Sequence, residues 1–238
     1  MLSSSFEGFS QSLRILFEAV FRSNELILVD PHEAAGNVEL GFTNLLNAFH
    51  SLYDSARTNP HVNIDWYGTP EIATILSIRN ARHHNISNRV RGLYTYHLDQ
   101  ENPQDFIQYL ILDYPETDDG GRTFQTLISW NDMDEMLSLS QSQNYLRASV
   151  PPAIREYLNS NLINSYSETY DLPKSSIFFN ATPLIVNAAM KVVPFIKNHV
   201  VPRSLEAKHF INHFENVSAA DTKKHVIEQI PVFLPVRP

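Results

Sequence analysis

The chain has 238 residues, a formal charge of −8 at pH 7 and no cysteine. The lack of cysteine excludes disulfide bonds, thiolate zinc sites and a cysteine nucleophile, and the negative charge means that any contact with nucleic acid must use a local basic patch. A hydrophobic fraction of 43% is enough for a substantial core, so we expect residues 1–238 to form one domain.

The N-terminal segment does not have the pattern of a signal peptide. Glu7, Arg14 and Glu18 interrupt the apolar region that such a peptide requires. The longest uncharged run, 175–190, is too short and too polar to span a bilayer. We therefore expect a cytoplasmic protein without membrane contact.

Apolar residues at helical spacing predict three amphipathic helices in the first part of the chain, over residues 4–21, 37–57 and 72–93. The apolar run 25–30 fits either a strand or a continuation of the first helix. Pro70 suits the first turn of the third helix. Three such helices with modest connections predict a mainly α protein built on a helical bundle.

A different pattern follows in residues 103–130. Two β-prone runs, 105–114 and 122–130, flank the turn signal of residues 117–121. This arrangement predicts a β-hairpin inserted into the helical fold.

The C-terminal part returns to helical patterns. A long apolar helix is predicted to begin near Thr182, and a final amphipathic helix or pair is predicted over residues 205–230. Residues 231–238, with three prolines, are predicted to form an extended tail.

The third predicted helix carries an unusual polar group. On a wheel of about 100° per residue, Arg79 falls near the centre of the apolar stripe, with His83 beside it. Asn80 and His84 lie on the flank of that stripe. Because buried charge is costly unless it is paired, this segment predicts a groove, a partner subunit or an anionic ligand next to Arg79.

The spacing of these residues resembles a known signature. Arg79 is followed directly by Asn80 and, after four intervening residues, by His84. This resembles the motif of the HEPN superfamily (higher eukaryotes and prokaryotes nucleotide-binding domains), and the resemblance covers the helical half of the chain around the motif. It implies an α-helical bundle, usually dimeric, in which the motifs of two subunits meet at a cleft. It also implies a metal-independent endoribonuclease that acts as a toxin or as an antiviral or abortive-infection effector.

The resemblance assigns catalytic roles to Arg79, Asn80 and His84, with His83 as the alternative to His84. RNA carries its own nucleophile, the 2′-hydroxyl, so the enzyme needs an acid or base near neutral pKa and a fixed cation for the charge that develops on phosphorus. The implied partners are an RNA substrate, a second copy of the chain, and an antitoxin or defence-system protein, and no cofactor is implied. The neighbouring arginines are expected to bind the RNA backbone; they are Arg82, Arg89 and Arg91.

Other functions fit the same residues. An Arg and a His on a helix often only satisfy groups within a core, and the chain would then be structural or a catalytically silent module that binds a protein or a nucleotide. His209 and His213, four residues apart, could hold a metal, but spacing fixes no third ligand. An acidic group could bind a cation, although a charged first helical turn explains it as well; this group is Asp132, Asp134 and Glu135.

Overall fold

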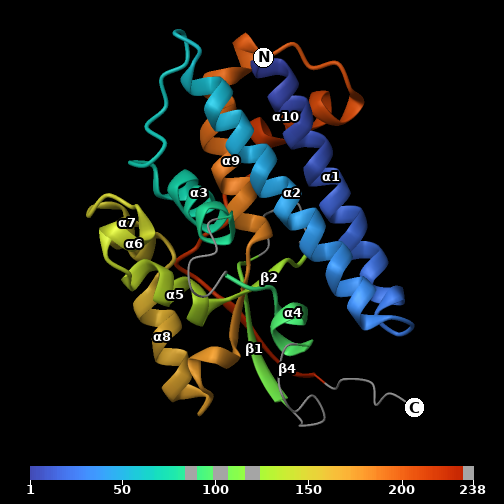
Figure 1. The fold of residues 1–238 in the computed structure, drawn as a ribbon, viewed down its shortest axis with the longest axis vertical. Coiled ribbons are helices and arrows are strands. Elements are labelled where there is room, and N and C mark those ends of the chain that lie inside the picture. Colours follow the sequence, from blue (N-terminus) through green and yellow to red (C-terminus); the bar gives the residue numbers. More distant parts are fainter. Residues whose placement is uncertain (84–89, 99–106, 116–123, 233–238) are drawn as a thin grey trace.

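Figure 1 shows a mainly helical protein with a small β-sheet, which confirms the predicted fold class at this level. The computed structural model describes residues 1–83, 90–98, 107–115 and 124–232. The α-helices in these ranges are α1 (Leu2–Leu26), α2 (Pro31–Arg57), α3 (Pro70–His83), α4 (Leu93–Leu98), α5 (Trp130–Ser138), α6 (Gln141–Asn144), α7 (Val150–Tyr157), α8 (Ser160–Thr169), α9 (Thr182–Ile196) and α10 (Leu205–Asn216). The strands are β1 (Ile107–Asp113), β2 (Leu127–Ser129), β3 (Ile177–Asn180) and β4 (Val226–Val232).

Helices α1 and α2 pack side by side along one flank of the molecule (Figure 1). Their facing stripes are aromatic, and the rings of Phe9 and Phe49 lie 5.6 Å apart between centroids. Residues 25–30, for which the sequence left strand and helix as alternatives, begin as helix. The first two belong to α1, and the chain then turns. Asp30 ends that turn and caps α2, because its carboxylate accepts a hydrogen bond from the Glu33 backbone N–H at 2.9 Å.

Helix α3 lies between α2, α7 and α9, and every residue from Ile72 to Ile78 is buried. The structure describes α3 to His83, and the prediction of one helix over 72–93 is wrong at residues 90–92, where the described chain resumes. Val90 has a φ of 46°, which no α-helix allows, and Gly92 forms an isolated bridge to Ile128 of β2. The core buries Val90, which accounts for its apolar side chain. Its spacing from the apolar residues of α3 matches the helical period only by coincidence.

Residues 103–130 do not form the predicted hairpin. β1 pairs in parallel with β3 and antiparallel with β4, while β2 pairs antiparallel with β3. The strand order is β2-β3-β1-β4, so β3 separates the two segments that were expected to pair. A turn signal indicates where the chain reverses, but a buried apolar strand from elsewhere can still insert between the two arms. The turn signal at 117–121 lies outside the described residues.

The predicted C-terminal helix is also shorter in the structure. Helix α10 ends at Asn216, and residues 226–232 form β4 on the edge of the sheet instead of helix. The predicted tail therefore begins within a strand, and residues 233–238 lie outside the described part of the chain. The spacing of apolar side chains in 226–230 fits both the helical and the strand period, and pairing with β1 makes this segment a strand.

One cluster of buried apolar side chains extends from α1 and α2 through α3 to α7, α9 and one face of the sheet. A smaller cluster under α4 covers the other face. Helix α3 is therefore central at its N-terminal end, and its C-terminal end reaches the surface beside α2.

Candidate functional site

Arg79 stands where α3 leaves the core. Its Nε donates to Asn47 Oδ1 of α2 at 3.4 Å, and its Nη1 donates to Asn80 Oδ1 at 3.2 Å. The side chain is partly exposed, and no carboxylate in the described part of the chain forms an ion pair with it. A guanidinium held by amide oxygens keeps its charge unneutralised, which leaves it able to bind an anion.

Asn80 is held from two directions. Its amide oxygen accepts from Arg79, and its side chain also forms a hydrogen bond with the hydroxyl of Tyr67. Burial raises the pKa of Tyr67, while Asn80 and the positive charges of Arg79 and Arg147 oppose that rise. Asn80 thus sets the orientation of Arg79, and Arg147 adds a further positive charge to the same region.

Of the two candidate histidines of the motif, the structure describes only His83. His83 is the last residue of α3 and is exposed. His84 lies outside the described residues, as does Arg89, so their assigned roles stay predictions. The helical wheel places Arg79 and His83 within the buried seam, but the continuous buried run of α3 stops at Ile78. Beyond it Ala81 is buried, whereas Arg79 is partly exposed and His83 is exposed.

Arg82 points in a different direction, and its guanidinium already has partners within the fold. It forms an ion pair with Glu39 of α2, donates to the Val90 carbonyl at 2.7 Å, and lies over the ring of Phe42. Its side chain is only 10% exposed, and burial lowers its pKa to about 10. Arg82 therefore joins α3 to α2 in this fold, and its predicted role in binding RNA stays a prediction.

Arg91 is also neutralised by a buried acid. Its Nε and Nη2 donate to the two oxygens of Asp132 at 2.9 and 2.8 Å, and its backbone N–H donates to the same carboxylate at 2.9 Å. Asp132 is fully buried. This bidentate pair fixes the chain ahead of α4 to the start of α5, and the predicted contact of Arg91 with RNA stays a prediction.

His50 completes the group around Arg79, and the sequence reasoning missed it. It follows Asn47 by one turn of α2, and its Nδ1 lies 3.2 Å from Asp54 Oδ2. Burial lowers its pKa, and the positive charges of Arg79 and His83 lower it further, while Asp54 raises it. The spacing of Asn47, His50 and Asp54 along one polar edge of α2 was visible in the sequence, but nothing there indicated that this edge faces Arg79.

The polar side chains of this region come from adjacent helices and the loop between them. We call them the Arg79 group: Asn47, His50 and Asp54 from α2, Tyr67 from the connecting loop, and Arg79, Asn80 and His83 from α3. The group contains one carboxylate against one guanidinium and two imidazoles. The carboxylate, Asp54, lies against His50 and not against Arg79, and Arg147 adds a positive charge nearby, so the Arg79 guanidinium is suited to a phosphate or another anion.

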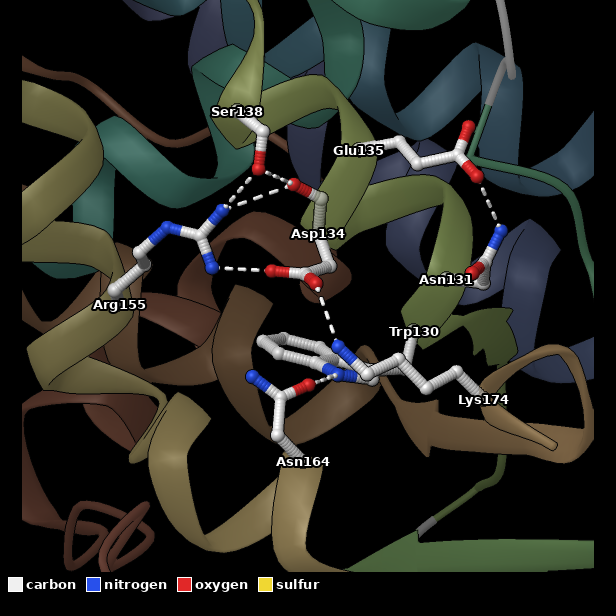
Figure 2. A network of polar contacts seen from close by, with 8 residues as sticks. All are labelled: Trp130, Asn131, Asp134, Glu135, Ser138, Arg155, Asn164 and Lys174. Atoms are coloured by element: carbon white, nitrogen blue, oxygen red, sulfur yellow. Dashed lines mark hydrogen bonds and ion pairs between the residues drawn. The ribbon is translucent and has the colours of Figure 1, made fainter. Parts of the chain in front are cut away.

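The acidic residues of α5 are explained by internal contacts (Figure 2). Asp134 pairs with Arg155 of α7 and, at 3.3 Å, with Lys174 Nζ, and Glu135 accepts from Asn131 at 2.7 Å. The rings of His209 and His213 stack with centroids 6.0 Å apart. Within the described residues, no three His, Asp or Glu side chains converge as a metal site would require.

A cavity of about 1100 Å³ lies between α2, α4 and the sheet, away from the Arg79 group. Three carboxylates line it, so an anion would be repelled there. They belong to Glu39, Asp113 and Glu228.

Comparisons with protein-family models, curated proteins and solved structures found no significant match to this chain. Among the helices of the described residues, none combines the length and apolar character needed to cross a bilayer.

Proposed function

We propose that the chain is a metal-independent endoribonuclease of HEPN type that acts as a toxin or as an antiviral effector. The observation that supports this is the state of Arg79. It is partly exposed, its guanidinium is held by amide oxygens, and imidazoles lie on both helices that contact it. Its two neighbouring arginines, Arg82 and Arg91, are instead neutralised by carboxylates.

The chemistry requires few protein groups. The 2′-hydroxyl of the nucleotide on the 5′ side of the scissile bond attacks phosphorus, and Arg79 binds the phosphate oxygens as their negative charge increases. Asn80 holds the guanidinium in place. A motif imidazole, assigned to His84 first and to His83 as the alternative, transfers a proton.

The implied assembly is part of the proposal. A homodimer that brings two Arg79 groups together would give an anion-binding cleft with twice the positive charge. The proposed setting is the cytoplasm, and the proposed partners are an RNA substrate and an antitoxin or a defence-system protein.

The test is cleavage of a mixed RNA pool by the purified protein in the presence of a chelator. Because removal of one charge-stabilising donor typically slows a reaction about 100-fold or more, Arg79→Gln should reduce the cleavage rate by at least that factor. His84→Ala and His83→Ala identify the motif imidazole. Arg22→Gln serves as a matched control, since Arg22 is exposed on α1 and has no place in the Arg79 group.

Two results would contradict the proposal. Cleavage that is unchanged in Arg79→Gln would remove the assigned site. Lack of cleavage of any RNA by the wild-type protein, together with RNA or nucleotide binding that depends on Arg79, would indicate a catalytically silent binding module instead.

A further inference from the structure

His50 differs from the other described histidines in what surrounds it. It lies on α2 with an acid one turn after it, at 3.2 Å from its Nδ1, and with Arg79 and His83 close enough to act on its charge. Its side chain is 23% exposed, so it is neither sealed in the core nor free in solvent. The ring of Tyr53 packs edge-on against it with centroids 5.4 Å apart.

The contact with Asp54 selects one tautomer of His50. If Nδ1 carries the hydrogen and donates to the Asp54 carboxylate, Nε2 carries the lone pair and can accept a proton. This is the arrangement of a histidine base oriented by an acid. Asp54 is 53% exposed, so it orients the ring without being buried with it.

The directions of the two helices determine how His50 and His83 lie relative to Arg79. Arg82 contacts Glu39 and Arg79 contacts Asn47, so the contacts run in opposite order along α2 and α3. His50 is one turn beyond Asn47, and His83 is one turn beyond Arg79 toward the other end of α2. The backbones of the two histidines are therefore on either side of Arg79 along α2.

We propose that His50 is a second catalytic imidazole, so that each chain carries its own base and its own acid on either side of Arg79. This inference rests on the proposed ribonuclease function and deepens it. His50 Nε2 takes the proton of the 2′-hydroxyl, and the 2′-oxygen forms a bond to phosphorus. The bond from phosphorus to the 5′-oxygen breaks, and that oxygen receives a proton from the imidazolium of His83, the motif histidine that lies within the described part of the chain. The products are a 2′,3′-cyclic phosphate and a 5′-hydroxyl, and exchange with water restores both histidines.

The charges around the two rings suit these roles. His50 faces Asp54 and Tyr53 on its own helix and Arg79 and His83 on α3. Burial and the two positive groups lower the pKa of His50, so it is neutral at pH 7 and able to act as a base. A phosphate on Arg79 would offset part of that positive charge.

The first experiment is the dependence of kcat/KM on pH for the wild type, His50→Gln and Asp54→Asn. Because general base catalysis contributes about 10²–10⁴-fold, His50→Gln should lose at least about 100-fold, mostly in kcat, and should lose the decline in rate on the acidic side of the profile. Asp54→Asn should lose about 10-fold, a smaller effect than loss of the base itself. His199→Gln is the matched control, since His199 is exposed and stacks on His61 away from the Arg79 group.

Melting temperatures of all variants show whether they fold, and unchanged RNA binding by His50→Gln separates a lost base from a lost site. If the wild type cleaves RNA and His50→Gln retains its rate and pH profile, this inference is overturned while the proposed function stands. If the wild type cleaves no RNA, both are overturned.

A mixing experiment tests whether the two imidazoles act within one chain. His50→Gln and Arg79→Gln, combined under conditions that exchange subunits, should remain inactive because no chain then holds a complete set. If the site were instead shared between subunits, half of the dimers would contain both mutants, and one of the two sites in each of those dimers would be complete. Recovery of about a quarter of the wild-type activity would therefore overturn the single-chain arrangement.

Discussion

The arginines of this protein are held in two different ways. Around α5, Asp132 and Asp134 bind Arg91 and Arg155, and Figure 2 shows the second of these pairs within a closed network. At the end of α3, Arg79 is held by the amide oxygens of Asn47 and Asn80. A carboxylate contributes orientation and removes the charge, whereas an amide contributes orientation and leaves the charge in place. The paired arginines join helices, whereas Arg79, which keeps its charge beside two imidazoles, is suited to bind a ligand.

The largest expected effect on stability concerns the arginines that are paired with carboxylates. Asp132→Ala should lower the free energy of unfolding by about 3 kcal/mol, because it removes a fully buried carboxylate that accepts three hydrogen bonds from Arg91. Urea denaturation measures the difference. Glu135→Ala on the same helix is the matched control and should change stability by less than about 0.5 kcal/mol, since Glu135 is exposed. Equal effects of the two changes would mean that the buried pair has no special role.

The direct comparison is the same substitution at two positions of α3. Arg82→Gln should cost about 2 kcal/mol, because it leaves Glu39 without its ion pair and reduces packing on Phe42. Arg79→Gln should cost less than about 0.5 kcal/mol, since its partners are neutral amides near the surface. Thermal and urea unfolding of both variants decide the matter. A large loss of stability in Arg79→Gln would make Arg79 a structural residue.

The smallest expected effect is on His50. Its pKa is lowered in the folded protein first by burial and then by Arg79, so Arg79→Gln should raise the pKa that NMR measures for the His50 ring. Arg82→Gln should leave it unchanged, because Glu39 already neutralises Arg82.

The same shift affects stability with a defined sign. The unfolded chain takes up a proton at His50 near its ordinary pKa of 6.5, and the folded chain does so only at lower pH. Stability contributed at this position is therefore lost as pH falls below 6.5 and levels off below the folded pKa. Arg79→Gln should reduce that slope, and a steeper slope would contradict the assigned source of the shift.

The sequence predicted the local features of the fold better than the long-range ones. The first two helices and most of the third were predictable because their apolar residues repeat at the helical period, and each buries one stripe or more against a neighbour. β3 was not predicted, and its insertion between β1 and β2 makes the expected hairpin wrong. Periodicity describes one segment at a time, whereas strand order depends on which distant segment provides the better partner.

The candidate site shows the same difference between local features, which the sequence predicts, and long-range contacts, which it does not. Arg79, Asn80 and His83 were identified because they interrupt an apolar pattern within one segment. His50 was missed because its importance comes from an approach of α2 to α3 that no local pattern contains. Arg82 and Arg91 were assigned by charge alone, and only the structure shows that Glu39 and Asp132 neutralise them.

The strand order has a consequence for the order in which the chain can assemble. β1 pairs on one edge with β3 and on the other with β4, and both partners follow it only after long stretches of sequence, so each edge of β1 stays unpaired until its distant partner has been synthesised. Closing such long loops is entropically costly and slow. Helices α1, α2 and α3 follow one another directly and can pack first. The Arg79 group therefore belongs to the part of the protein that can form early during translation, while the sheet forms late.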